Sequence, residues 1–142
     1  MRTSGGARVF DSGPGIGSGG AGGAEPSRLL YASTGGVAVV LESWPVAEGT
    51  FVGVSVDITL GYDDGAIARA RNVFAHADAR RRPGSGATFN GTSPLNDAGT
   101  AAGVAVTWSI VDEALTLSIQ TSYTGNVAVI WHARVREMDL PT

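Results

Sequence analysis

The chain contains no cysteine, and its ten basic residues are all arginine. Without cysteine it can form no disulfide, no thiolate metal site and no cysteine nucleophile, so packing or partner subunits must hold the fold together. No run of about 18 apolar residues occurs, and no basic segment followed by an apolar stretch opens the chain, so we expect neither membrane insertion nor a signal peptide. A formal net charge of −3 argues against general nucleic-acid binding.

Groups that could bind a metal or a cofactor are also few. The only histidines are His76 and His132, too few for a histidine-rich metal site. His132 is expected on the solvent-facing side of a strand, opposite Ser118. Glycines near the N-terminus match the spacing G-x-G-x-x-G, but no strand precedes them and no helix follows, so a dinucleotide site is not expected. We predict no cofactor and no metal.

Two pairs of carboxylates could in principle bind calcium or act in acid–base chemistry: Asp63 with Asp64, and Asp112 with Glu113. Both pairs fall in predicted turns, where acidic residues commonly cap the backbone. No serine lies in the strand–turn–helix context of a nucleophile elbow. The residues alone therefore predict a protein that is not an enzyme.

The C-terminal third alternates between apolar and polar residues in three consecutive runs, 104–110, 115–120 and 127–136. This is the period of a sheet with one buried face. Pairing Ile110 with Leu115 keeps the inward residues together and leaves 111–114 as a loop. A second hairpin then places Ile119 opposite Trp131, with 124–126 as its loop. These runs predict a three-stranded meander in which Trp108 and Trp131 lie in the core.

An earlier run, 52–60, alternates in the same way, and Asp63, Asp64 and Gly65 form a strong hairpin turn signal. The segment 66–79 is ambiguous, because its alanines favour a helix while its alternation favours a strand. We predict a strand, since the turn implies a hairpin. The expected fold is an all-β, antiparallel, jelly-roll-like β-sandwich over residues 27–142, ending in the meander.

Residues 1–26 form a glycine-rich segment with only three sizeable apolar side chains, Val9, Phe10 and Ile16. Such a segment buries too little surface to fold alone. The interpretation is an extended arm in which these three residues anchor the subunit to a neighbouring protein. A flexible tail is the alternative.

Two surfaces could contact a partner. Arg80, Arg81 and Arg82 form a basic run in a predicted loop, which could bind phosphate, an acidic sugar or an acidic protein surface, or could simply be solvated. The polar side of the meander carries serine and threonine, a surface that suits a virion protein or a carbohydrate contact. Few aromatic residues lie on it, which weakens the carbohydrate interpretation.

Together, the strand at 52–60, the arginine-alternating strand at 66–77 and the finishing segments 104–110, 115–119 and 126–135 give residues 30–138 a recognisable pattern. It resembles a domain that recurs in structural proteins of tailed bacteriophages, often at the C-terminal end of tail fibres or other virion appendages. The resemblance implies a β-sandwich acting as a virion component, and it supplies no active-site motif.

The resulting hypothesis is a non-enzymatic phage virion protein: a capsid decoration, head-fibre or tail-associated subunit that binds other virion structural proteins through its N-terminal arm. We expect it to be located in the virion and to form a homo-oligomer. The alternative is a module of a phage fibre that binds a glycan or another receptor on the host surface.

Overall fold

A computed structural model describes residues 8–12, 26–101 and 103–141. These residues contain nine β-strands and no helix. The strands are β1 (Arg8–Ser12), β2 (Ser27–Thr34), β3 (Val39–Pro45), β4 (Thr50–Asp63), β5 (Ala68–Arg81), β6 (Thr88–Gly99), β7 (Val104–Val111), β8 (Ala114–Thr121) and β9 (Thr124–Asp139).

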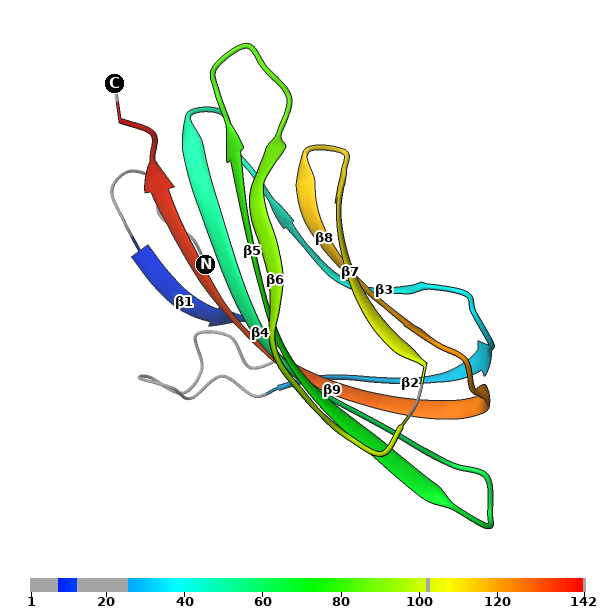
Figure 1. Cartoon of the computed structure of the whole chain (residues 1–142). Coiled ribbons are helices and arrows are strands. Elements are labelled where there is room, and N and C mark those ends of the chain that lie inside the picture. The colour runs from blue at the N-terminus through cyan, green and yellow to red at the C-terminus, as the bar shows by residue number, and fades with distance from the viewer. Residues whose placement is uncertain (1–7, 13–25, 102, 142) are drawn as a thin grey trace.

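The strands form two antiparallel sheets that pack face to face (Figure 1). In the large sheet the order is β9, β4, β5, β6, and both β1 and β2 pair with the free edge of β9. The small sheet has the order β3, β8, β7. The predicted all-β, antiparallel sandwich is confirmed.

Alternation along the long strands decides what enters the core. On β4 the residues Val52, Val54, Val56, Ile58 and Leu60 are all buried, while the residues between them face the other side of the sheet. The small sheet covers this apolar face with Trp44, Leu115, Leu117 and Ile119. Each buried residue of this size stabilises the fold by about 1.5–3 kcal/mol, so the two sheets are held together along their whole contact.

The segment that was ambiguous between helix and strand forms β5, as predicted. It pairs with β4 from Ala68 opposite Asp63 to Arg81 opposite Thr50. The alanines at 75, 77 and 79 are buried, so their small size serves close packing between the sheets rather than helix formation. Gly65, with a φ of 88°, makes the turn before the strand.

The hairpin of β7 and β8 has the predicted register: Ile110 lies opposite Leu115, and Trp108 opposite Leu117. The connection is tighter than expected, because Val111 and Ala114 also pair and only Asp112 and Glu113 form the turn. Both turn residues have positive φ, 50° and 63°. A two-residue turn of this kind matches the twist of the strands it joins.

The second half of the predicted meander is wrong, because β8 and β9 belong to different sheets. β8 pairs with β3 and β7, whereas β9 pairs with β4, so Trp131 lies opposite Ile58 and not opposite Ile119. The alternation of β9 specifies which side chains point inward, and a facing sheet satisfies that pattern as well as a hairpin neighbour does. The alternation therefore predicted which side chains of β9 point inward, but it did not identify the strand beside β9.

Both tryptophans nevertheless contribute to the core. Trp131 is 5% exposed, and its indole N–H donates a 2.8 Å hydrogen bond across the sandwich to Oε1 of Glu42 on β3. Trp108 is half-buried against the same core, with its ring centroid 6.1 Å from that of Trp44. Trp131 thus joins the two sheets by packing and by a hydrogen bond.

Part of the predicted N-terminal arm is a strand of this chain's own sheet. β1 pairs with β9 from Arg8 opposite Glu137 to Ser12 opposite Ala133. β2 occupies the adjoining stretch of the same edge, so the two strands lie end to end along β9. Val9 and Phe10 belong to β1, and Ile16 lies outside the described residues.

Candidate functional site

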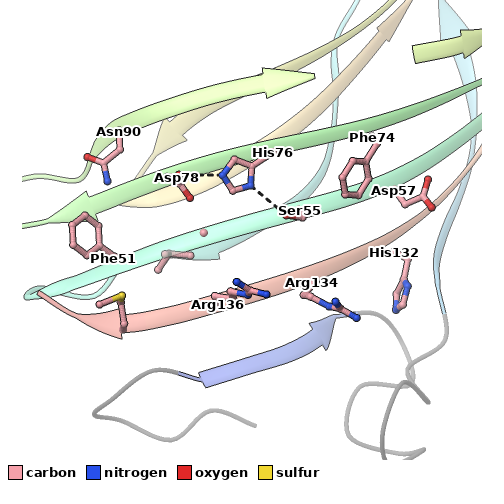
Figure 2. A pocket seen from close by; sticks show the side chains of 13 residues that line it. Phe51, Ser55, Asp57, Phe74, His76, Asp78, Asn90, His132, Arg134 and Arg136 are labelled. Carbon is pink, nitrogen blue, oxygen red and sulfur yellow. Dashed lines mark hydrogen bonds and ion pairs between the residues drawn. The ribbon is translucent and has the colours of Figure 1, made fainter. Parts of the chain in front are cut away.

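A hollow lies on the side of the large sheet that faces away from the small sheet, here called the outer face. It has a volume of about 730 Å³ and is lined mainly by alternate residues of β4, β5 and β9 (Figure 2). Its side chains include Phe51, Ser55, Phe74, His76, Asp78 and Arg136. Along each strand these residues alternate with the residues that form the core, and they point to the opposite side of the sheet.

Strand register brings the central groups together. Ser55 on β4 is paired with His76 on one side and with Arg134 of β9 on the other. Asp78 follows His76 by two residues on β5, so both side chains emerge on the same face. Residues that are 21 or more positions apart in sequence therefore meet in the middle of the sheet.

Ser55, His76 and Asp78 form a continuous row of contacts, shown by the dashed lines in Figure 2. The Ser55 hydroxyl oxygen is 3.2 Å from Nδ1 of His76, and Nε2 of His76 is 3.0 Å from Oδ2 of Asp78. The side chains of His76 and Asp78 are 34% and 44% exposed, so the row is open to solvent and to a ligand.

A glycine makes room for the carboxylate at the end of this row. A Cβ atom at Gly53 would lie 2.8 Å from Oδ1 of Asp78, closer than real Cβ contacts come. Gly53 is directly opposite Asp78 in the β4–β5 register. The missing side chain thus lets the Asp78 carboxylate lie over β4, on the same side as His76.

Apolar side chains surround the polar centre. Phe51 and Phe74 lie on either side of the Ser55–His76–Asp78 row in Figure 2, and Met138 also lines the hollow. Phe74 is 38% exposed, so part of its ring is accessible to a ligand. The outer face therefore combines one exposed ring, Phe74, and one half-buried ring, Phe51, with groups that donate and accept hydrogen bonds.

β9 adds positive charge to the same face through Arg134 and Arg136, with His132 farther along the strand (Figure 2). His132 is half-buried and lies opposite Asp57 on β4. The sequence placed it opposite Ser118, and that prediction is wrong for the same reason as the meander: β9 is not a neighbour of β8.

The predicted basic loop is mostly a strand end. Arg80 and Arg81 are the last two residues of β5, and only Arg82 lies beyond it, exposed to solvent. Arg80 donates to the side-chain oxygen of Asn90, while Arg81 forms ion pairs with Glu48 at 3.5 Å and with Glu113 at 3.3 Å. Arg80 and Arg81 thus connect neighbouring segments of this chain.

The serine and threonine residues expected on an open surface are partly enclosed. Thr116 and Ser118 are buried because β8 is the central strand of the small sheet, and Thr116 contacts the Ser43 hydroxyl of β3 at 3.0 Å. The prediction of a solvated polar face on the meander is wrong at these two positions.

The first carboxylate pair, Asp63 with Asp64, accepts backbone N–H groups of its own turn, whereas Glu113 of the second pair binds outside its turn. Oδ1 of Asp64 accepts backbone N–H groups of Ala66 and Ile67, and these bonds lower the pKa of its carboxyl below the usual value for aspartate. Glu113 accepts the backbone N–H of Ala87. The described residues contain no group of three or more histidine, aspartate or glutamate side chains arranged to hold a metal ion.

No family model matches the chain, and no curated protein matches it. Among solved structures it is similar to the tailspike protein of Acinetobacter phage vB_ApiP_P1, with 17% identity and a TM-score of 0.51, over 75% of this chain and 20% of that one. A weaker similarity is to the tailspike of Acinetobacter baumannii phage AM24, with 8% identity and a TM-score of 0.45, over 80% of this chain and 25% of that one. Another is to the tailspike gp49 of Acinetobacter baumannii bacteriophage Fri1, with 14% identity and a TM-score of 0.41, over 82% of this chain and 17% of that one.

These similarities concern the fold, and the chain spans about a fifth of the length of the first tailspike. The gp49 protein is described as a capsular polysaccharide depolymerase. The prediction that the present protein is not an enzyme is wrong: it relied on the lack of a recognisable motif, and the tailspike similarities contradict it. In the described part of the chain, no helix is long and apolar enough to cross a membrane.

The sequence contains a weak signal for the outer face. The residues between the buried positions of β4 are Phe51, Gly53, Ser55 and Asp57, an unusual series for a merely solvated strand face. What the sequence could not supply was the identity of the neighbours, because His76 and Arg134 reach Ser55 only through strand pairing.

Proposed function

We propose that this chain is part of a tail-associated virion protein of a tailed bacteriophage and that its outer face binds a polysaccharide on the host surface. The observation that carries the proposal is the outer face itself: an open hollow in which the rings of Phe51 and Phe74 flank hydrogen-bonding side chains. The similarity of fold to a phage tailspike supports the viral context.

Saccharides present two kinds of surface, and the outer face offers a complement to each. The C–H groups on one side of a sugar ring stack on aromatic rings, a role suited to Phe51 and Phe74. Sugar hydroxyls pair with carboxylate, amide and guanidinium groups, which Asp57, Asn90 and Arg136 supply. An open hollow also suits a chain polymer, which must extend beyond the site at both ends.

The outer face is a different surface from the polar side of the predicted meander, where the sequence suggested a carbohydrate contact. The scarcity of aromatic residues on the polar side of the meander argued against a carbohydrate contact there. Phe51 and Phe74 lie on the large sheet instead, on strands β4 and β5. The objection therefore does not apply to the outer face.

Two phenylalanines of equal exposure allow a matched test. Phe74 lines the hollow and Phe89 does not, although both are 38% exposed. Fragments of bacterial capsular and O-antigen polysaccharides would be arrayed, and the fragment retained by the unmodified protein titrated by calorimetry. We expect Phe74→Ala to weaken binding by about fivefold, the effect of losing one ring contact of about 1 kcal/mol, and Phe89→Ala to leave it unchanged.

Equal losses in both variants, or no loss in Phe74→Ala, would contradict the proposal. The proposal would also be contradicted if the unmodified protein retained no fragment although its circular dichroism showed a folded sheet structure. Because both substitutions remove the same ring from a partly exposed position, a general effect of lost apolar surface would change both variants together.

We further propose that the N-terminal segment attaches the protein to other virion proteins, with Val9, Phe10 and Ile16 as anchors. The position of β1, which holds Val9 and Phe10, supports this, because the strand lies at the edge of the large sheet. The exposed Arg82 is a second contact candidate. In assembled particles, Ile16→Asp is expected to lower the amount of protein incorporated without changing its melting temperature, and an unchanged amount would contradict the anchor role.

A further inference from the structure

We infer that Ser55, His76 and Asp78 form a hydrolytic site that removes ester-linked acyl groups from a saccharide held on the outer face; this inference rests on the proposed binding of polysaccharide there. Many acyl-transfer enzymes use a serine that is hydrogen-bonded to a histidine, which is in turn hydrogen-bonded to a carboxylate. Such a triad is recognised by its geometry rather than by the positions of its residues in the chain. Here both ring nitrogens of His76 have a partner, at 3.2 Å and 3.0 Å.

The direction of the hydrogen bonds follows from the chemistry of the partners. A carboxylate can only accept, so Nε2 of His76 carries the hydrogen that points to Asp78. In the neutral ring Nδ1 is then the acceptor, and the Ser55 hydroxyl donates to it. This arrangement is that of a serine beside a general base, with the base held in one tautomer by a carboxylate.

The two ring nitrogens are used in the opposite sense to the familiar serine hydrolases, in which Nε2 faces the serine. The chemistry is unaffected, because each nitrogen of imidazole can take up a proton while the other donates to the carboxylate. What matters is that serine and carboxylate contact different nitrogens, as they do here.

Positive charge for the transition state comes from β9. Arg136 is paired with Gly53, one side-chain pair along from Ser55 on the same face, within the reach of a long side chain. Figure 2 shows its guanidinium on the outer face, together with that of Arg134. When Ser55 attacks an ester carbonyl, negative charge develops on the carbonyl oxygen. That oxygen would lie beside the positive charge of Arg136.

The reaction balances with water as the only co-reactant. The Ser55 oxygen bonds to the ester carbonyl carbon while its proton moves to Nδ1 of His76. The tetrahedral intermediate expels the sugar oxygen, which takes the proton from His76 and leaves as a free hydroxyl. Water then attacks the acyl-serine with His76 again as base, releasing a carboxylic acid and restoring Ser55.

The side chains favour an acyl ester over a glycosidic bond as the substrate. Glycosidic cleavage commonly uses two carboxyl groups that flank the bond as acid and as base or nucleophile. Two carboxylates, Asp57 and Asp78, line the hollow, but Asp78 is engaged with His76, which leaves Asp57 alone for an acid or base role at a glycosidic bond. The group held against a base is the Ser55 hydroxyl. O-acylated sugar residues, with the sugar stacked on Phe74 and the acyl group over Ser55, fit this arrangement.

A covalent probe and an ester substrate test the inference directly. The full chain would be treated with a fluorophosphonate, which labels activated serines, and the labelled residue located by mass spectrometry. Hydrolysis of 4-nitrophenyl acetate and release of acetate from an O-acetylated oligosaccharide would be measured in parallel. Variants are Ser55→Ala, His76→Gln and Asp78→Asn, with Ser109→Ala and Asp112→Asn on the small sheet as matched controls.

We expect the label on Ser55, and a loss of about 100-fold or more in hydrolysis for Ser55→Ala and His76→Gln, the range typical of a general base and its nucleophile. Asp78→Asn should lower the rate and both controls should retain it. No labelling of Ser55, or rates equal in Ser55→Ala and the unmodified protein, would overturn the inference. Polysaccharide binding in Ser55→Ala separates the two proposals: retained binding without any hydrolysis by the unmodified protein overturns the hydrolytic site alone.

Discussion

The two faces of the large sheet are made by the same strands, yet they differ in almost every physical property. Toward the small sheet, β4 presents Val54 and Val56, which are fully buried, and β5 presents small alanines. On the outer face the neighbouring positions hold Ser55 and His76, which contact each other and solvent. One residue of displacement along a strand separates a close-packed apolar interior from a polar, ring-flanked hollow.

This difference implies that stability and ligand chemistry are separable in this protein. Inner-face side chains lose packing when truncated, whereas outer-face side chains are already in contact with water and leave no cavity. The connection between the faces is the backbone, which fixes the spacing of the outer-face groups once the core has packed. Substitutions on the two faces should therefore change different measured quantities.

The largest expected effect is the loss of the tryptophan that joins the sheets. Trp131→Ala should lower the free energy of unfolding by about 3–5 kcal/mol, because it leaves a large cavity and removes the hydrogen bond to Glu42. Urea denaturation followed by circular dichroism would measure this. An unchanged transition midpoint would contradict the assignment of Trp131 to the core.

A smaller effect, and a direct comparison of the faces, comes from two positions on β4. Ile58→Ala should lower the free energy of unfolding by about 2–5 kcal/mol, since Ile58 is fully buried. Ser55→Ala, three residues away on the outer face, should change it by about 0.5 kcal/mol or less. Comparable losses from the two substitutions in the same denaturation assay would break the distinction between the faces.

Gly53→Ala should disturb the site while sparing the fold. The added methyl group would collide with the Asp78 carboxylate, whose displacement breaks its contact with His76. We expect an ester hydrolysis rate lower by about tenfold, or 1.4 kcal/mol in barrier, with a melting temperature close to that of the unmodified protein.

Gly91→Ala is the control for this substitution, because a Cβ atom at Gly91 meets nothing within 4 Å. Its hydrolysis rate should be unchanged. If the two alanine variants have equal rates, Gly53 does not serve to place Asp78.

The smallest effect concerns the turn between β4 and β5 and depends on pH. The pKa of Asp64 is lowered in the folded chain, by its hydrogen bonds to the backbone of Ile67 and Ala66. Its ionised form therefore stabilises the fold above the unfolded pKa of 3.8, and this contribution disappears as the pH falls through the lower folded value. Asp64→Asn should melt at a slightly lower temperature than the unmodified protein at pH 7, and at the same temperature near pH 2. A difference that persists at pH 2 would contradict the role of the charge.

Much of the fold could be predicted because alternation reports directly on side-chain direction. The strand at 68–81, the β7–β8 register and the burial of Trp131 all follow from periodicity and turn residues. The partners of β9 could not be predicted in this way, because a strand packed against a facing sheet has the same pattern as one in a hairpin. The choice between them depends on long-range packing that a local pattern does not contain.

The candidate site was missed for the same reason. Ser55, His76 and Arg134 each look like an ordinary exposed residue on its own strand. The β4–β5 hairpin brings Ser55 beside His76, and the placement of β9 on the other side of β4 adds Arg134. The incorrect placement of β9 beside β8 separated Arg134 from the other two. The local signal was the presence of aromatic residues, Phe51 and Phe74, at positions that face away from the core.

The central claim, that the outer face is the ligand-binding surface, is tested most directly by amide chemical-shift mapping. The isotope-labelled protein would be titrated with the polysaccharide fragment that it retains on an array. We predict saturable shifts concentrated at out-facing positions of β4, β5 and β9, around Ser55, Phe74 and Arg136. Shifts concentrated on β3, β7 and β8, with the outer face unchanged, would contradict the claim.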